Sequence, residues 1–174
     1  MKADARIEWQ PEEIEENLEN YREIIEKGMK EGLRQAIRTT EEGGREVLGE
    51  RAATVGNERI QQSLSTGDRH NISKVVSHQT AEVGTNYPGV NLIKEGTRPH
   101  MPPWTPIQEW VEKNTGALNV TDIGRATYYF RKHISEHGTE ATHFLTEGLA
   151  IKRDDVQKAI NEAAEKIIKE LGLE

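Results

Sequence analysis

The chain of 174 residues contains no cysteine, so it cannot form a disulfide, use a thiolate nucleophile or hold zinc through cysteine. Aromatic residues are also scarce, at 5% of the chain with only two phenylalanines, and an apolar content of 34% allows only a lean core. No segment approaches the roughly 18 consecutive apolar residues of a membrane-spanning helix, and the first residues hold no apolar signal-peptide region. We therefore expect a soluble protein made in the cytoplasm, without membrane contact.

Basic residues are fewer than acidic residues, and most of this difference lies in the N-terminal segment. The formal net charge is −7, and residues 1–50 hold 14 acidic against 8 basic residues, whereas residues 51–150 hold 10 of each. Affinity for nucleic acid comes mainly from clustered lysine and arginine, so a surface that grips phosphates is not expected. The acidic segment is either a solvated helix face or a negative wall that repels DNA.

Two amphipathic helices are predicted at the ends of the chain. Pro11 suits a first helical turn, and the glutamates after it suit the positive end of the helix dipole. Apolar residues at steps of three and four extend this helix to about Thr40. Gly28 and Gly32 lie on its apolar face, where they indicate either close packing against another element or a local bend. The helix predicted over residues 154–172 has the apolar stripe Val156, Ile160, Ala163, Ile167 and Leu171.

The middle of the chain mixes helical and extended patterns. The sequence EEGG at residues 41–44 predicts a break or kink, and a second helix is expected over residues 45–64. Alternation over residues 72–78 and 80–86 predicts a β-hairpin. Residues 120–138 read as a helix with a terminal glycine as its stop.

These elements give an α+β fold class: long N-terminal helices, a small antiparallel sheet with a β-hairpin, and C-terminal helices. A short helix is expected to begin with Thr105 as N-cap, Pro106 in the first turn and Gln108 reaching back to the cap. Residues 139–145 read as a short extended piece. We expect one domain in three parts: an N-terminal helical region over residues 1–64, an α+β core with the Pro-rich loop over residues 65–150, and a C-terminal helix over residues 151–174.

Histidine offers the one candidate for metal chemistry. His133 and His137 are four residues apart and share a helix face, and His143 follows six residues later. The catalytic glutamate spacing of H-E-x-x-H is missing. Two histidines near a helix C-terminus are also favoured by the helix dipole alone. A metal-dependent enzyme using these three histidines stays open as an alternative.

Other catalytic patterns are missing from the sequence. No serine stands in a G-x-S-x-G context, and the carboxylate pairs lie on amphipathic helices where exposure is the default. The sequence GTNYPGVN has neither the lysine of a phosphate-binding loop nor the spacing of a dinucleotide-binding loop. We therefore expect no catalytic residues and no cofactor.

Four of the six prolines crowd into one segment, together with two tryptophans. Each well-placed proline can stabilise the folded state by ~0.4–1 kcal/mol, so this loop is stiff before anything binds it. Trp104 and Trp110 are expected either to divide between core and partner, or both to lie in the core. We predict a rigid docking loop formed by Glu95, Gly96, Thr97, Arg98, Pro99, His100, Met101, Pro102, Pro103 and Trp104.

The sequence YPGVNLIKEGTRPHMPPWTPIQEWV at residues 87–111, followed by HGTEATHFLTEGLA at residues 137–150, resembles the tail-completion proteins of long-tailed bacterial and archaeal viruses. That family has a helical N-terminal region, a β-hairpin, a tyrosine-containing stretch leading to Glu-x-Gly-Thr, a Pro-rich loop, a helix and a second Gly-Thr before Phe-Leu. The resemblance covers about residues 60–150. Pro88 stands where the family has alanine, and His143 where it has proline.

The resemblance implies a structural virion protein of the head–tail neck, with no enzymatic activity. Such a protein forms a homo-oligomeric ring that joins the head-side connector or adaptor to the tail terminator or tail tube, and viral DNA passes through without specific binding. Tail symmetry favours six copies, with twelve as the alternative. The protein would be assembled in the host cytoplasm and be located in the virion neck. A cytosolic helical adaptor, with terminal helices that bind a partner, is the remaining alternative.

Overall fold

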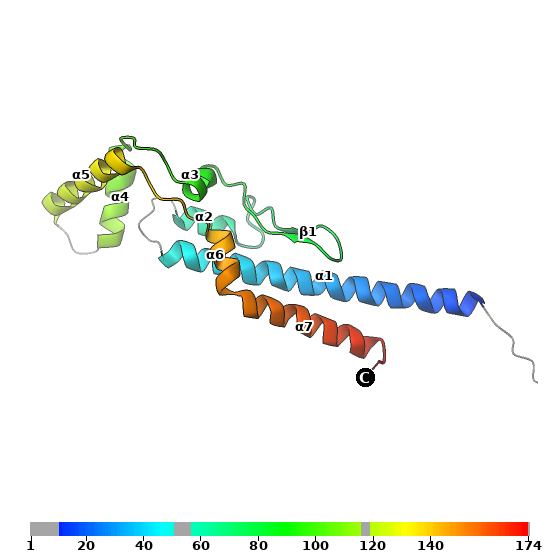
Figure 1. Ribbon diagram of the computed structural model, residues 1–174. Coiled ribbons are helices and arrows are strands. Elements are labelled where there is room, and N and C mark those ends of the chain that lie inside the picture. The colour runs from blue at the N-terminus through cyan, green and yellow to red at the C-terminus, as the bar shows by residue number, and fades with distance from the viewer. Residues whose placement is uncertain (1–10, 51–56, 116–118, 174) are drawn as a thin grey trace, which may run out of the picture.

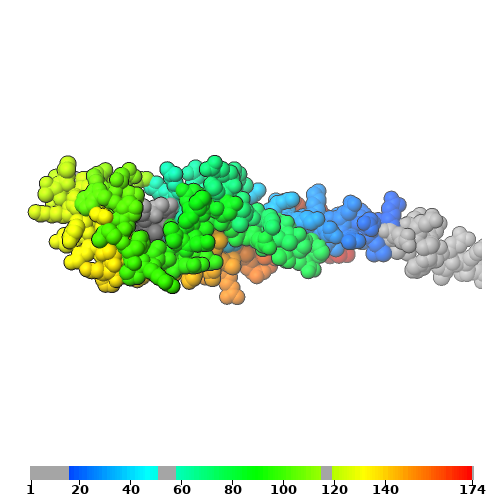
Figure 2. Space-filling view, turned by 90° about the horizontal axis from the view of Figure 1, so that it is seen from above, coloured from blue at the N-terminus to red at the C-terminus, as the bar shows by residue number. Residues whose placement is uncertain are grey.

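The computed structural model describes residues 11–50, 57–115 and 119–173 of the chain. It is elongated: helices lie along one axis, and a helical pair projects at one end (Figure 1). Seen from above, the molecule is broad at the end with this pair and narrow at the end where α1 begins (Figure 2). The accessible surface is 12659 Å², against roughly 8,600 Å² for a compact protein of this mass, which agrees with the extended outline.

The spine of the molecule is α1 (Pro11–Glu50), along which α7 (Arg153–Glu170) packs. Two glycines of α1 allow this close approach. A Cβ placed on Gly32 would lie 2.7 Å from the Ala163 Cβ, and one on Gly28 would overlap the Ile167 side chain. The expectation of close packing at these two glycines is therefore confirmed, and the local bend is not the explanation.

The predicted break at Gly43 and Gly44 is wrong, since α1 continues through both residues to Glu50. The reason is the short helix α6 (Phe144–Ile151), which crosses α1 at this point. A Cβ on Gly148 of α6 would lie 2.8 Å from the Gly44 Cα, so the two backbones touch without intervening side chains. Packing thus compensates for the low helix propensity of the glycine pair. Residues 139–145, expected to be extended, enter this helix at Phe144.

A small core lies where α1 ends. There α1 contacts α2 (Asn57–Ser63), which is shorter than the helix predicted over residues 45–64. Residues 45–50 belong to α1 instead, and residues 51–56 lie outside the described part of the chain. A short helix that the sequence did not predict, α3 (Val90–Glu95), adds the buried side chain of Ile93 to this core. The buried members of this cluster are Val47, Leu48, Ile60, Leu64, Ile93 and Phe144.

The α+β assignment is wrong: the structure is 69% helical, and the sheet of its described residues has two strands, β1 (Lys74–Val75) and β2 (Ala81–Glu82). The hairpin forms at the predicted place, but its antiparallel ladder holds only two residue pairs. The Ser73 hydroxyl explains its short length. It accepts the Gly84 N–H at 3.1 Å, so a side chain replaces the backbone bond that would extend the ladder.

The helical pair at the broad end, which we call the arm, consists of α4 (Trp104–Thr115) and α5 (Val120–His137). The helix α5 matches its prediction, because the N–H of Gly138 caps it on Ile134 O. In contrast, α4 begins one residue before Thr105, and the predicted cap is wrong. The Gln108 side chain accepts a hydrogen bond from the Trp104 indole N–H at 2.7 Å instead of reaching back to the cap.

Candidate docking surface

The arm joins the rest of the molecule through two Gly-Thr segments that pair with each other. Thr97 and Thr139 form an antiparallel bridge, in which each N–H donates to the other carbonyl at 3.1 Å. Their hydroxyls lie 3.0 Å apart and form a third bond. The glycines that precede them, Gly96 and Gly138, have φ values of 71° and 76°, a region that other residues rarely adopt. The repeated Gly-Thr motif of the sequence is therefore one structural unit.

The predicted docking loop starts at this bridge and runs along α5. Its inner side is fastened: Pro102 is buried, and its carbonyl accepts a hydrogen bond from Arg131 Nε at 2.8 Å. The same guanidinium lies 5.1 Å from the centre of the Trp104 ring, a cation–π contact. One arginine of α5 thus positions both the middle and the end of the loop.

The outer side of the loop faces solvent. Met101 is 59% exposed and Trp104 is 39% exposed, and neither belongs to the core cluster. Arg98, Pro99 and His100 are exposed as well, and the His100 ring approaches the Arg98 carbonyl at 2.9 Å. The loop is therefore rigid on one side and open on the other, which is the geometry that a preformed docking element needs.

Trp110 has a different environment from Trp104. It is half-buried in the seam between α4 and α5, where its ring meets Phe130 edge-on with ring centres 5.0 Å apart. Ile107 and Val111 of the same helix are buried beside this seam. Trp110 therefore holds the arm together, and Trp104 is the tryptophan available at the surface.

The three candidate metal ligands are not brought together. His133 and His137 stack on α5 with ring centres 4.5 Å apart, and the Nδ1 of His137 lies 3.1 Å from the His133 carbonyl. His143 lines a different groove, beside Val83 and Lys94. Across the described ranges, no group of three or more histidine, aspartate or glutamate side chains has the arrangement of a metal site.

A buried carboxylate that sequence reasoning missed lies on α1. Glu41 is 2% exposed, and its Oε1 accepts a hydrogen bond from the Asn71 amide at 2.7 Å. The same amide donates to Leu64 O at 3.1 Å, and the Asn71 Oδ1 accepts the N–H of Ser73. Glu41 thus fixes the turn that carries the chain from α2 into the hairpin. Glu41 follows the buried Ile37 by four residues, so the two share one face of α1, and this spacing was the sequence signal for its burial.

Within the described ranges, no helix is both long and apolar enough to cross a membrane. Comparison with models of protein families, with curated proteins and with solved structures found no match to this chain. The resemblance to tail-completion proteins therefore rests on the motifs at residues 87–111 and 137–150, and it stays a prediction.

Proposed function

We propose that this chain is a tail-completion protein, a non-enzymatic structural subunit of the neck ring that joins a viral head to its tail. The observation that carries the proposal is the order of motifs from Tyr87 to Leu145. The structure adds support at one point, because the two Gly-Thr motifs of that order, 42 residues apart, pair through Thr97 and Thr139. They hold the docking loop at the base of the arm.

The docking loop is the part of the surface that we propose for contact with an adjacent subunit or a neighbouring neck protein. An assembly of many copies multiplies any ordering cost, and a loop fixed in advance loses less entropy per contact. The three prolines of the loop, Pro99, Pro102 and Pro103, provide this stiffness in the sequence, and Arg131 adds a fixed anchor. A catalytic lid would need hinges in place of prolines, because it must open.

Electron microscopy of assembled particles tests the neck function directly. We expect density for this chain as a ring at the head–tail junction, with six copies, or twelve, and with DNA crossing its centre. The chain is expected to be monomeric or weakly associated in dilute solution and to close its ring on the virion. Tailed particles that lack the chain would contradict the proposal, and so would stoichiometric zinc, iron or manganese in protein purified without a tag.

The docking loop has its own test. Arg98→Ala with Met101→Ala removes two exposed side chains, so the melting temperature of the isolated chain should hardly change while head–tail joining fails. Arg131→Ala is the matched internal change, and it should lower the melting temperature because it releases Pro102 and Trp104. A large melting loss in the Arg98/Met101 variant with normal particle assembly would make the loop an internal brace. Deletion of residues 94–104 separates an adaptor, which would keep its partner, from a neck protein.

A further inference from the structure

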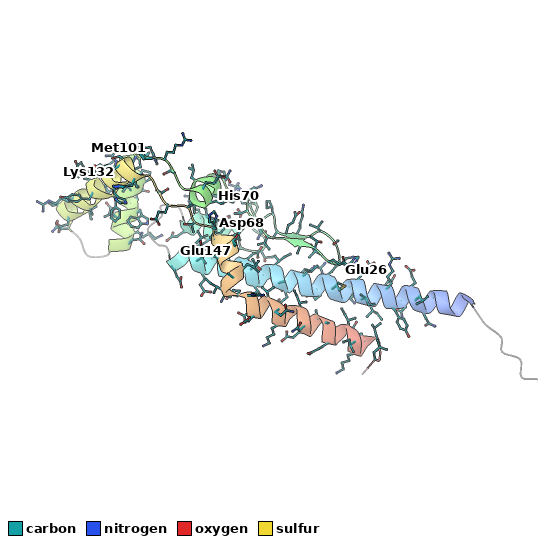
Figure 3. All side chains as sticks on the ribbon, viewed as in Figure 1. Glu26, Asp68, His70, Met101, Lys132 and Glu147 are labelled. Carbon is teal, nitrogen blue, oxygen red and sulfur yellow. The ribbon has the colours of Figure 1, made fainter. Side chains whose placement is uncertain are left out.

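The tip of the β-hairpin lies against two apolar hollows. The first is a groove of about 620 Å³ between α1 and the end of α7, and the second is a cavity of about 270 Å³ farther along the same two helices. His78 and Gln79 at the tip line both hollows, and so does Met29 of α1. In Figure 3 the hairpin runs from its base near His70 to its tip near Glu26. The tip is therefore a wall that the groove and the cavity share.

The base of the hairpin is firmly held to the rest of the chain. The Asn71 amide donates to the buried Glu41 carboxylate at 2.7 Å and to Leu64 O at 3.1 Å. On the other strand, the Thr85 hydroxyl donates to the hydroxyl of Ser63 at 2.8 Å, and Ser63 is itself buried. Both strands are thus fixed at the end where the hairpin joins the helices.

Residues 72–84, which we call the flap, have no such attachment to the helices beneath them. Within the part of the chain that the structure describes, no hydrogen bond or ion pair joins the flap to α1 or α7. The bonds of the flap stay inside the hairpin: the Val76 N–H donates to Thr80 O at 2.9 Å, and Lys74 pairs with Glu82 at 3.3 Å. The flap therefore rests on α1 through packing alone.

This packing is weak, because the larger apolar side chains of the flap face solvent. Successive side chains of a strand point to opposite faces. Ile72 is 50% exposed and Val76 is 52% exposed, so their face points away from the helices. The side chains of the opposite face are small and only half-buried: Ser73, Val75, Ser77, Ala81 and Val83. None of the residues of the flap is buried, so the flap adds little to the core.

We propose that the flap opens from α1 and α7 while the rest of the chain stays folded, and that its opening joins the groove and the cavity into one apolar groove. Regions with few buried apolar contacts open locally, without global unfolding. Because the tip is the wall between the two hollows, its movement exposes Met29 and Leu33 along α1. This opening does not depend on the neck function, since only the attachment of the hairpin sets it.

Native-state hydrogen exchange tests the proposal at single amides. A detached two-stranded hairpin is marginally stable, so the amides of an open flap exchange with solvent. The Val76 N–H should exchange at least about a hundredfold faster than the Asn86 N–H, which donates over the same distance, 2.9 Å, to His70 O at the base. Low urea should hardly change the Val76 rate, because a local opening exposes little surface, and should raise the rate of the Leu48 amide in the core.

A covalent lock provides the second test, since the chain has no cysteine of its own. Gln79→Cys and Ala164→Cys, at two positions that line the cavity, are joined by a short bismaleimide. The lock should slow the exchange of the Val76 N–H by at least about tenfold. The matched control carries Gln79→Cys alone, capped with N-ethylmaleimide, and should keep the wild-type rate.

Two results would overturn this inference. One is a Val76 N–H that exchanges at the rate of the Asn86 N–H and with the urea dependence of the core, which would mean that the flap opens only when the whole chain unfolds. The other is a Val76 rate that the cross-link leaves unchanged, which would mean fraying inside the hairpin without movement away from the helices. A neck ring seen in particles alongside either result would leave the proposed function standing.

Discussion

Replacing Gly43 by alanine tests the backbone contact between α1 and α6, on which the path of the spine depends. A Cβ at this position would lie 2.8 Å from the Gly148 carbonyl carbon and 2.9 Å from the Lys152 Cγ, and it would overlap the Gly148 carbonyl oxygen. The lysine side chain can move aside, but the helix backbone cannot. The new methyl group therefore pushes α6 away from α1, and with it the buried ring of Phe144.

The magnitude follows from two opposing effects. Alanine in place of glycine favours a helix by ~1 kcal/mol. Overpacking costs ~1–3 kcal/mol, and the upper end applies because rigid backbone must move. We expect a net loss of about 2 kcal/mol in the free energy of unfolding for Gly43→Ala. For a chain of this size, that lowers the melting temperature by roughly 4–8 °C.

Gly49→Ala is the matched control, because it makes the same substitution in the same helix. A Cβ there would meet only the flexible Gln61 Nε2, at 3.7 Å. This variant should gain up to ~1 kcal/mol of stability from helix propensity. Urea unfolding followed by circular dichroism measures both variants. Equal stability of Gly43→Ala and Gly49→Ala would refute the close helix crossing.

Three further predictions concern single contacts. Glu41→Ala should cost ~1.5–3 kcal/mol in urea unfolding, and a double-mutant cycle with Asn71→Ala should show coupling of at least ~0.5 kcal/mol; additive losses would mean that the two side chains act independently. Gly138→Ala should lower the melting temperature, since the new Cβ meets the Thr97 carbonyl across the bridge at positive φ. Gly124→Ala, inside the α5 helix that Gly138 caps, finds open space and should raise it; a rise in both would contradict the bridge. The hydrogen bond from Lys152 to Glu46 raises the pKa of the lysine. The stability that this contact contributes is therefore present below pH 10.5 and is lost as the pH rises through the raised pKa. Lys152→Met should remove that loss from the pH profile of the melting temperature.

Local patterns predicted the helices whose ends and stripes are encoded nearby. The α5 helix ends before Gly138, as its sequence predicts, while its N-cap, in which the Asn119 side chain accepts the Asp122 N–H, comes from the structure. The α7 stripe likewise faces α1, with Ala163 and Ile167 packed against the glycines of α1. Each of these features depends on residues within a few positions along the chain, which is why the sequence alone was enough.

The errors arise where distant segments decide the outcome. Gly43 and Gly44 read as a break because no local feature shows that Gly148 will lie against them. The hairpin was expected to be longer because alternation does not reveal that Ser73 will take the place of a ladder bond. The α+β class followed from that overestimate and from the extended reading of residues 139–145.

Only the local features of the candidate docking surface could be predicted, because its other features depend on distant segments. Proline content identified a stiff loop, and its exposed residues agree with a docking role, which stays a prediction. The anchor on Arg131, 29 residues beyond Pro102, could not be read from spacing. The sequence shows two Gly-Thr motifs, but only the structure shows that Thr97 and Thr139 pair with each other.

The distribution of apolar surface gives a reason for an isolated subunit to be weakly stable. The main core cluster has six buried residues near one end of α1, while the other half of that helix packs against α7 and leaves Leu18, Tyr21 and Ile25 exposed. Burying such side chains contributes roughly 25 cal/mol for each Å² removed from water. In the proposed ring, a chain that leaves this surface open would gain stability when a neighbour covers it, so folding and assembly would be coupled. That coupling would keep the free chain adaptable and make the assembled form rigid.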